Sequence, residues 1–277
     1  MTHLEHAGIN VIRKAFGERI AAQASLLYRD RIQPTLERLT YENDPRGRRS
    51  LGTLRDFRNR YLGRRCFIIG NGPSLNSMDL SPLRNEFTFA LNRGYLLTER
   101  MGAPASFLVT VNPYVVEQFA PEIVKAPSPT FVSWRSKRWV PASADVTFLR
   151  RARLFTFASD MTRGAWEGAT VTYVALELAF HMGFSDVILI GVDHSFATEG
   201  PANKLVTSSG SDPNHFDASY FGAGVKWQLP DLEVSELAYR LALAAYAADG
   251  RRIRDATLNG KLTVFPKVSY EDLVRRA

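Results

Sequence analysis

The chain has 277 residues, of which 45% are hydrophobic, enough for one large domain or for a domain with an appendage. No apolar stretch reaches the length of a membrane span, and the polar N-terminus does not resemble a signal peptide. The single cysteine, Cys66, excludes an intrachain disulfide and a cysteine-based metal cluster. These features predict a cytoplasmic protein.

The net charge of +7 is concentrated at the start of the chain. Residues 1–65 contain 14 Lys and Arg but 7 Asp and Glu, whereas the remainder contains 21 of each kind. This excess is typical of a solvated, charged helical surface. The alternative is peripheral contact of residues 1–62 with an anionic membrane surface, at the inner membrane face, or with a phosphorylated, lipid-linked acceptor. Nucleic acid is not expected as a partner, because the basic clusters lack interleaved aromatic residues.

The first 62 residues are predicted to form a basic helical appendage. Apolar residues keep rough helical spacing over 5–42, where Pro34 is the main breaker. The composition predicts a linker over 43–53 and a short helix over 54–62. Residues 63–277 would then form the catalytic domain.

From Arg65 onward, short apolar runs alternate with helical patterns, which is typical of an α/β fold with a parallel sheet. The predicted strands cover residues 66–70, 87–91, 106–111, 129–134 and 186–192. The predicted helices cover residues 74–84, 94–102, 114–125, 168–182 and 232–248. The expected fold is a Rossmann-like parallel sheet flanked by helices.

Residues 197–231 interrupt this alternation. The segment is rich in Gly and Pro but carries several aromatic residues, which disordered segments lack, so it predicts a lid loop over a binding site. After the helix at 232–248, residues 251–265 predict a last strand and a short hairpin around Asn259-Gly260.

An apolar run, Phe67 to Ile69, ends in Gly70-Asn71-Gly72-Pro73-Ser74. A buried strand, a glycine turn and a helix N-terminus together make a cradle in which backbone N–H groups and the helix dipole favour a phosphate. Leu75 stands where the dinucleotide fingerprint has its third glycine, so a standard NAD site is not expected. A turn without ligand is the alternative.

Other polar residues follow the predicted strands and should meet at the same edge of the sheet. They are Asn71, Asn92, Asn112 and Asp193-His194-Ser195. Asparagine offers both a donor and an acceptor, which suits ribose hydroxyls and a base edge, although Asn and Asp are also common turn residues. Gly168-Ala169-Thr170, at a predicted helix start, offers a second phosphate-sized site.

His194 and His215 are the candidate general bases, because the unperturbed pKa of histidine lies near neutral pH. A structural histidine is the alternative for either. Asp193 would orient a base or hold a metal. A metalloprotease helix motif, a Walker lysine loop and a nucleophile elbow are all missing from the sequence.

Several of these motifs resemble known families. The bacterial sialyltransferases of glycosyltransferase family 42 are similar in Gly70-Asn71-Gly72-Pro73-Ser74-Leu75, Leu91-Asn92-Arg93, Val111-Asn112-Pro113, Gly168-Ala169-Thr170-Val171, Met182-Gly183-Phe184 and Ile190-Gly191-Val192-Asp193. A related family, the 6-hydroxymethylpterin diphosphokinase-like proteins, includes domains of motility-associated flagellin glycosyltransferases. It is more similar in Gly191 to Phe196, His215-Phe216, Tyr220-Phe221-Gly222 and Ala256 to Leu262. The resemblance covers roughly residues 65–268.

The resemblance implies a single Rossmann-like domain that binds a CMP-activated sugar and needs no metal. Residues matching Asn71, Asn92 and Gly168 to Thr170 contact the nucleotide in the sialyltransferases, and a lid histidine matching His215 is the general base. Ser195 and Phe196 stand where the sialyltransferases have tyrosines that hold the leaving phosphate. Ser195 and Tyr220 are therefore the candidates for this role, with His194 as a further donor.

We therefore expect a metal-independent, inverting glycosyltransferase that moves an acidic sugar (sialic acid, a related nonulosonate or Kdo) from a CMP donor to a surface-glycan or glycoprotein acceptor. A homo-oligomer is expected. One alternative is a pterin diphosphokinase-like enzyme that uses ATP and Mg²⁺, with Asp193 as the metal ligand. Another is a non-catalytic nucleotide-binding module in polysaccharide assembly.

Overall fold

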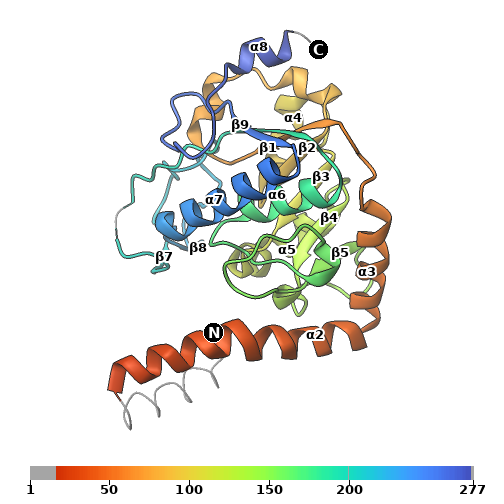
Figure 1. The fold of residues 1–277 in the computed structure, drawn as a ribbon. Helices are drawn as coiled ribbons and strands as arrows, with labels where there is room; N and C mark the ends of the chain where they lie inside the picture. Colours follow the sequence, from red (N-terminus) through yellow and green to blue (C-terminus); the bar gives the residue numbers. More distant parts are fainter. Residues whose placement is uncertain (1–16, 199, 276–277) are drawn as a thin grey trace.

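A computed structural model describes residues 17–198 and 200–275. Its centre is a parallel sheet of seven strands in the order β5-β4-β3-β2-β1-β6-β9 (Figure 1). The strands are β1 (Arg65–Ile69), β2 (Thr88–Leu91), β3 (Phe107–Thr110), β4 (Thr130–Ser133), β5 (Val146–Leu149), β6 (Asp186–Ile190) and β9 (Arg252–Asp255). The predicted Rossmann-like fold class is confirmed.

The strand order reverses between β1 and β6. The chain steps outward from β1 through β2, β3 and β4 to β5, and then returns to the other side of β1 with β6. Ile69 of β1 therefore pairs with Ala90 of β2 on one side and with Ile190 of β6 on the other. In open α/β sheets the crevice at such a switch point is the usual ligand site. The loops that follow β1 and β6 are therefore the first place to look for function.

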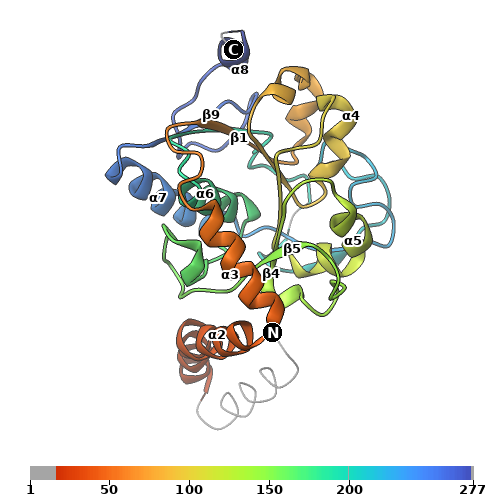
Figure 2. The ribbon, with the colours of Figure 1, turned by 90° about the vertical axis from the view of Figure 1, so that its right-hand side faces the viewer.

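Successive side chains of β1 enter two separate cores, because strand residues alternate between the faces of a sheet. Cys66 and Ile68 belong to one core, with α3 (Pro45–Phe57), α6 (Val171–His181) and α7 (Leu232–Ala248). Phe67 and Ile69 belong to the other, with α5 (Pro113–Lys125) and part of the lid. Figure 2 shows α3, α6 and α7 on one side of the sheet and α4 (Thr98–Met101) and α5 on the other.

The N-terminal helical prediction holds over the described part. Residues 17–27 are helical, continue through a π-helical turn (η1, Tyr28–Ile32) and end with α2 (Gln33–Asn43), while residues 5–16 lie outside the described part. The Tyr41 hydroxyl of α2 donates to the Phe148 carbonyl of β5 at 2.7 Å.

The linker predicted over 43–53 is wrong, because α3 begins at Pro45. Asp44 caps it by accepting a hydrogen bond from the Arg46 amide, and a proline is well tolerated at the first helical position. Leu54 and Phe57 of α3 pack in the main core. Although α3 lies before the predicted domain boundary at residue 62, it packs into the core of the predicted catalytic domain.

The helix predicted over 74–84 is also wrong. Two 3₁₀ turns stand there instead, Pro73–Ser77 and Ser81–Asn85, because Pro82 has no N–H to continue a helix. The predictions missed β5, the short ribbon of β7 (Leu205–Thr207) and β8 (Lys226–Gln228) inside the lid, and α8 (Tyr270–Val274). The hairpin expected around Asn259-Gly260 does not form; β9 is the last strand in the described part of the chain.

One buried acid in α6 predicts a dependence of stability on pH. Glu177 is fully buried; its Oε1 accepts from the Ala158 amide at 2.8 Å, and its Oε2 has no partner among the described residues. Burial raises the pKa of this carboxyl well above its ordinary value. A pKa raised by folding gives stability that is complete below the unfolded-state pKa and is lost as the pH rises toward the folded-state pKa.

We therefore expect Glu177→Gln to raise the melting temperature, and to raise it more at pH 8 than at pH 5. Each unit of raised pKa corresponds to about 1.4 kcal/mol of stability that the wild type loses. Paired thermal unfolding curves at the two pH values measure this. An equal difference at both pH values would mean that Glu177 keeps its ordinary pKa.

Candidate functional site

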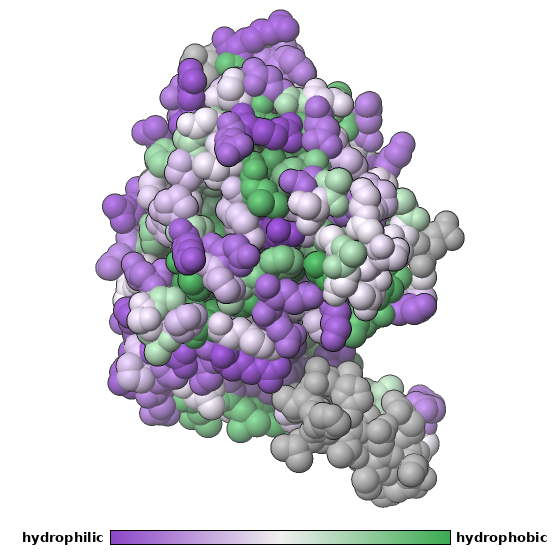
Figure 3. Space-filling view, turned by 180° about the vertical axis from the view of Figure 1, so that it is seen from behind, coloured by the Kyte–Doolittle hydropathy of each residue, from purple (hydrophilic) through white to green (hydrophobic). Residues whose placement is uncertain are grey.

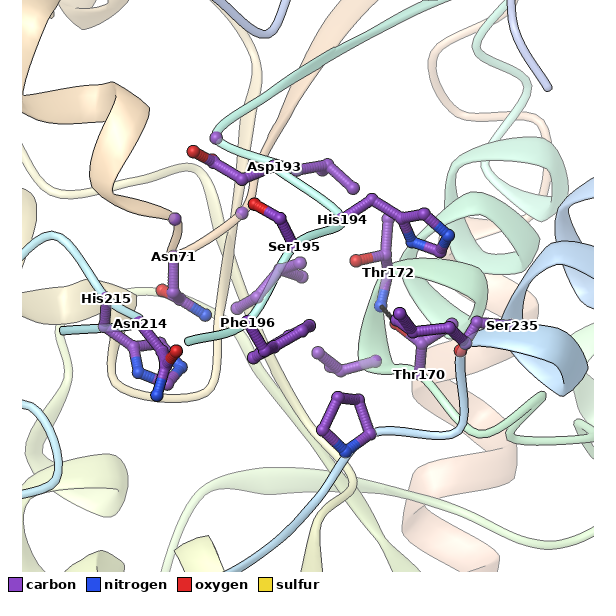
Figure 4. A pocket seen from close by; sticks show the side chains of 18 of the residues that line it. Asn71, Thr170, Thr172, Asp193, His194, Ser195, Phe196, Asn214, His215 and Ser235 are labelled. Atoms are coloured by element: carbon purple, nitrogen blue, oxygen red, sulfur yellow. Dashed lines mark hydrogen bonds between the residues drawn. The ribbon is translucent and has the colours of Figure 1, made fainter. Parts of the chain in front are cut away.

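A cleft opens at the switch point, over the carboxyl ends of β1 and β6 (Figure 4). Its floor consists of the turn after β1 (residues 70–72) and the segment after β6 (residues 191–196). Its walls are the N-terminal ends of α6 and α7 and the lid residues Asn214, His215 and Pro230. Segments predicted separately to bind a nucleotide therefore meet in one place.

Two positions in the turn after β1, Gly70 and Gly72, are packed too tightly for any residue larger than glycine. A Cβ atom on Gly70 would lie 2.2 Å from the Gly191 carbonyl oxygen, and one on Gly72 would lie 1.8 Å from Oδ2 of Asp193. The Asp193 carboxylate accepts hydrogen bonds from the amide of Ser74 at 3.0 Å and from its hydroxyl at 2.7 Å. A carboxylate of the protein thus occupies the cradle that Pro73 and Ser74 form.

The second predicted anion site, at the start of α6, opens into the cleft. Thr170 caps the helix by accepting from the Thr172 amide, and residues 169–172 all line the cleft. Gly168 and Ala169 both have positive φ, 54° and 59°. Ala169 holds this conformation despite its Cβ atom, and strain of this kind clusters at functional sites. Because the first residues of α6 line the cleft, the positive end of the helix dipole points into it.

The lid presents a histidine paired with a carboxylate. His215 lines the cleft, and its Nδ1 lies 2.7 Å from Oδ2 of Asp212, which is itself buried. Asp212 also accepts from the amides of Asn214 and Phe221, so its orientation is fixed on three sides. An ionised carboxylate only accepts hydrogen bonds, so this contact favours the His215 tautomer that carries a proton on Nδ1.

Tyr220 supports this histidine from behind. Its ring is fully buried and stacks on His215 at a centroid distance of 4.1 Å, while its hydroxyl accepts from the Arg93 amide. The Arg93 guanidinium in turn donates to the Tyr220 carbonyl. Tyr220 does not line the cleft, whereas Ser195 does. This geometry favours Ser195 over Tyr220 for contact with a leaving phosphate.

His194 lies on the other side of the cleft from His215 (Figure 4). Its Nε2 is 3.1 Å from Oε1 of Glu236 on α7, and its backbone has a φ of 54°. Like Ala169, it is a residue with a Cβ atom in the left-handed region. Two such residues face one cleft.

The three predicted asparagines have different surroundings. Asn71 lines the cleft, and its buried Oδ1 has no partner among the described residues. Asn112 caps α5 by accepting from the Tyr114 amide, and the Oδ1 of Asn92 accepts from the Thr110 hydroxyl at 3.3 Å. Neither of these two lines the cleft. The sequence pattern grouped them with Asn71 because all three asparagines follow a strand, where asparagine is a common turn residue.

The sequence predictions missed Asp212, Glu236 and Tyr239, which support or line the site. The spacing Asp212-x-x-His215 is a local signal that was available. Glu236 and Tyr239 lie on α7, and only the packing of that helix against α6 brings them to the cleft.

The described lining of the cleft contains few charged residues. Lysine and arginine are missing from its described lining, so the α6 N-terminus supplies its positive potential. Among the residues that the structure describes, no cluster of three or more His, Cys, Asp or Glu could hold a metal ion. Within the same residues, no helix is both long and apolar enough to span a membrane.

The family model described as 6-hydroxymethylpterin diphosphokinase MptE-like matches residues 40–199. A solved structure, the MAf glycosyltransferase from Magnetospirillum magneticum AMB-1, matches with 15% identity and a TM-score of 0.49 over 81% of this chain. The chain spans 38% of that protein. No curated protein gave a significant match.

Proposed function

Because the chain belongs to the 6-hydroxymethylpterin diphosphokinase MptE-like family, we propose that it is a transferase acting on a nucleotide-activated substrate. Specifically, we propose an inverting glycosyltransferase that moves an acidic sugar from a CMP donor to a hydroxyl of a surface glycan or glycoprotein. The observation that carries this proposal is the Asp212–His215 pair, which presents a histidine to a cleft at the switch point.

In this proposal, Nε2 of His215 takes the proton of the acceptor hydroxyl while its oxygen bonds to the anomeric carbon of the sugar. The bond from that carbon to the phosphate oxygen breaks, and CMP leaves with the electron pair. Attack and departure on opposite faces invert the configuration. The Asp212 carboxylate stabilises the imidazolium that forms and holds the ring in place.

The leaving phosphate would lie at the N-terminus of α6, near Thr170 and His194. Backbone N–H groups, the helix dipole and one imidazole suit a modest charge. A nucleoside monophosphate carries less negative charge than a diphosphate or triphosphate, which enzymes commonly hold with Mg²⁺ or a lysine. The missing lysine and arginine in the described lining therefore favour CMP as the carrier.

Asn71 is proposed to contact the nucleotide. Its buried Oδ1 has no partner among the described residues, and such a group is costly for a protein to keep without a purpose. A rotation of the side chain would bring amide donor or acceptor atoms toward a ribose or a base. Ser195, exposed in the cleft, would donate to a phosphate oxygen.

A diphosphokinase that uses ATP and Mg²⁺ is the second candidate, and the name of the matching family favours it. In that mechanism Asp193 would be the natural ligand of Mg²⁺. Each oxygen of Asp193 accepts one hydrogen bond from Ser74 and keeps a second lone pair, so Mg²⁺ binding is compatible with the turn after β1. We rank the kinase second because lysine and arginine are missing from the described lining of the cleft.

Thermal unfolding in the presence of single nucleotides separates the two candidates. We expect CMP to raise the melting temperature without added metal, and ATP with Mg²⁺ to have no effect; the gain is about 2.7 kcal/mol at 100 times the dissociation constant. CDP, UDP, GDP and NAD serve as controls. Stabilisation by ATP with Mg²⁺ alone would establish the kinase instead. Binding of CMP without hydrolysis of any CMP-sugar would indicate a non-catalytic module.

A further inference from the structure

The N-terminal helix carries an apolar stripe that is exposed within the described part of the chain. We define it as five of the six large apolar residues of the helix that are between 46% and 59% exposed, because the sixth, Leu26, lies on another side of the helix. They are Ile20, Leu27, Ile32, Leu36 and Leu39. Figure 1 shows the helix below the body of the protein, and Figure 3 shows apolar side chains at the lower edge of the molecule, beside the atoms drawn in grey.

The opposite side of this helix holds it to the domain. Asp30 accepts from the Leu154 amide at 3.0 Å, Glu37 accepts from the Arg151 amide at 2.6 Å, and the Tyr41 hydroxyl donates to β5. These anchors fix the rotation of the helix about its axis. The stripe is thereby turned away from the domain rather than toward its core.

The π turn brings the two halves of the stripe into line. Ile20 and Leu27 are seven residues apart, as are Ile32 and Leu39, and a seven-residue step returns to nearly the same side of an α-helix. In a regular α-helix, the five-residue step from Leu27 to Ile32 would not return to the same side. Hydrogen bonds in η1 run from residue i to i+5, so the turn holds an extra residue, and this step then closes one turn.

The stripe is self-complementary in an antiparallel pair. If Ile20 of one copy lies opposite Leu39 of another, then Leu27 lies opposite Ile32, and the smaller Ala24 lies opposite Thr35. The second copy repeats the same contacts, as a two-fold axis requires. Helices that pair through seven-residue repeats pack such side chains between one another.

The charge of the helix indicates a protein partner rather than an anionic membrane. Residues 17–43 contain four arginines and four acidic residues, so their net charge is zero. The basic excess lies later, in residues 44–65, with eight arginines against two aspartates. We propose that the stripe is a homodimer interface, in which two copies of the chain pair their N-terminal helices in antiparallel orientation.

Sedimentation of the full-length protein at micromolar concentration tests this interface. The wild type should sediment with twice the monomer mass. Leu27→Glu should raise the dimer dissociation constant by about 10²-fold or more, because each of the two symmetric layers then buries an unpaired carboxylate. Leu27→Glu combined with Ile32→Lys should restore the dimer, since the register places the new carboxylate of each copy opposite the new ammonium group of the other. Leu27→Glu combined with Ile32→Glu should not.

Leu62→Glu is the matched control, because Leu62 is a leucine outside the helix that is slightly more exposed than Leu27, and this variant should remain dimeric. Circular dichroism confirms that each variant stays folded. A monomeric wild type would overturn the proposal, as would equal masses for all variants. Failure of the oppositely charged double variant to restore the dimer would overturn the antiparallel register. A monomer that floats with anionic vesicles through the same leucines would assign the stripe to a membrane.

Discussion

Replacing His215 with alanine is expected to lower turnover by about 10²–10⁴-fold, the usual contribution of a general base. Without the imidazole, the acceptor hydroxyl has no group to take its proton as the bond to phosphate breaks. Nucleotide affinity should change little, because the proposed phosphate site lies at the α6 N-terminus and His194, on the other side of the cleft. Transfer from a CMP-sugar measures the first effect, and stabilisation by CMP measures the second.

Asp212→Asn gives a graded form of the same experiment. The variant keeps the shape of the side chain but loses the charge that supports the imidazolium at 2.7 Å, so its turnover should lie between those of the wild type and His215→Ala. Asp217→Asn is the control, since Asp217 is a half-buried lid carboxylate that accepts hydrogen bonds from Ser219 instead. Near-normal turnover of His215→Ala would remove His215 from the mechanism, and His194 would be the next residue to test.

The parallel sheet was predictable from sequence because buried parallel strands are short, continuous apolar runs between helical patterns. Phe67 to Ile69 and Val187 to Ile190 fit this rule and became β1 and β6. The segment that became β5, Val146 to Leu149, is as long as β2, β3 and β4, but no α-helix separates it from β4, so the alternation of strands and helices did not mark it. The start of α3 was predicted as a linker because Pro45 is a common turn signal. Proline also suits the first position of a helix, and that is the role of Pro45 in the structure.

The site was predictable in its location but not in its polar contacts. Strand-end residues such as Asn71 and His194 must lie at the carboxyl edge of the sheet once the strands are known. Which of them face a ligand depends on partners far away in sequence. Asp193 pairs with Ser74 across 119 residues, and Tyr220 with Arg93 across 127 residues. No local pattern contains this information.

The tight turn at the end of β1 leads to the second large effect, in which Gly70→Ala should destabilise the fold by about 3 kcal/mol, the upper end of the range for overpacking. The new Cβ atom would lie 2.2 Å from the Gly191 carbonyl oxygen, which belongs to the backbone and cannot rotate away. Relief requires β1 and β6 to separate at their carboxyl ends. The floor of the cleft would then open, and CMP binding should weaken in parallel.

Gly52→Ala provides the contrast that isolates this cause. Gly52 lies inside α3, and a Cβ atom there would meet nothing within 4 Å, so alanine should stabilise the protein by about 0.5–1 kcal/mol. Chemical unfolding of both variants and the wild type measures the free energy of unfolding, which should fall for Gly70→Ala and rise for Gly52→Ala. If Gly70→Ala matched the wild type in stability and still lost CMP binding, Gly70 would be needed for contact with the ligand and not for closing the strands. Loss of both together would show that the cleft floor depends on how closely the two strands approach.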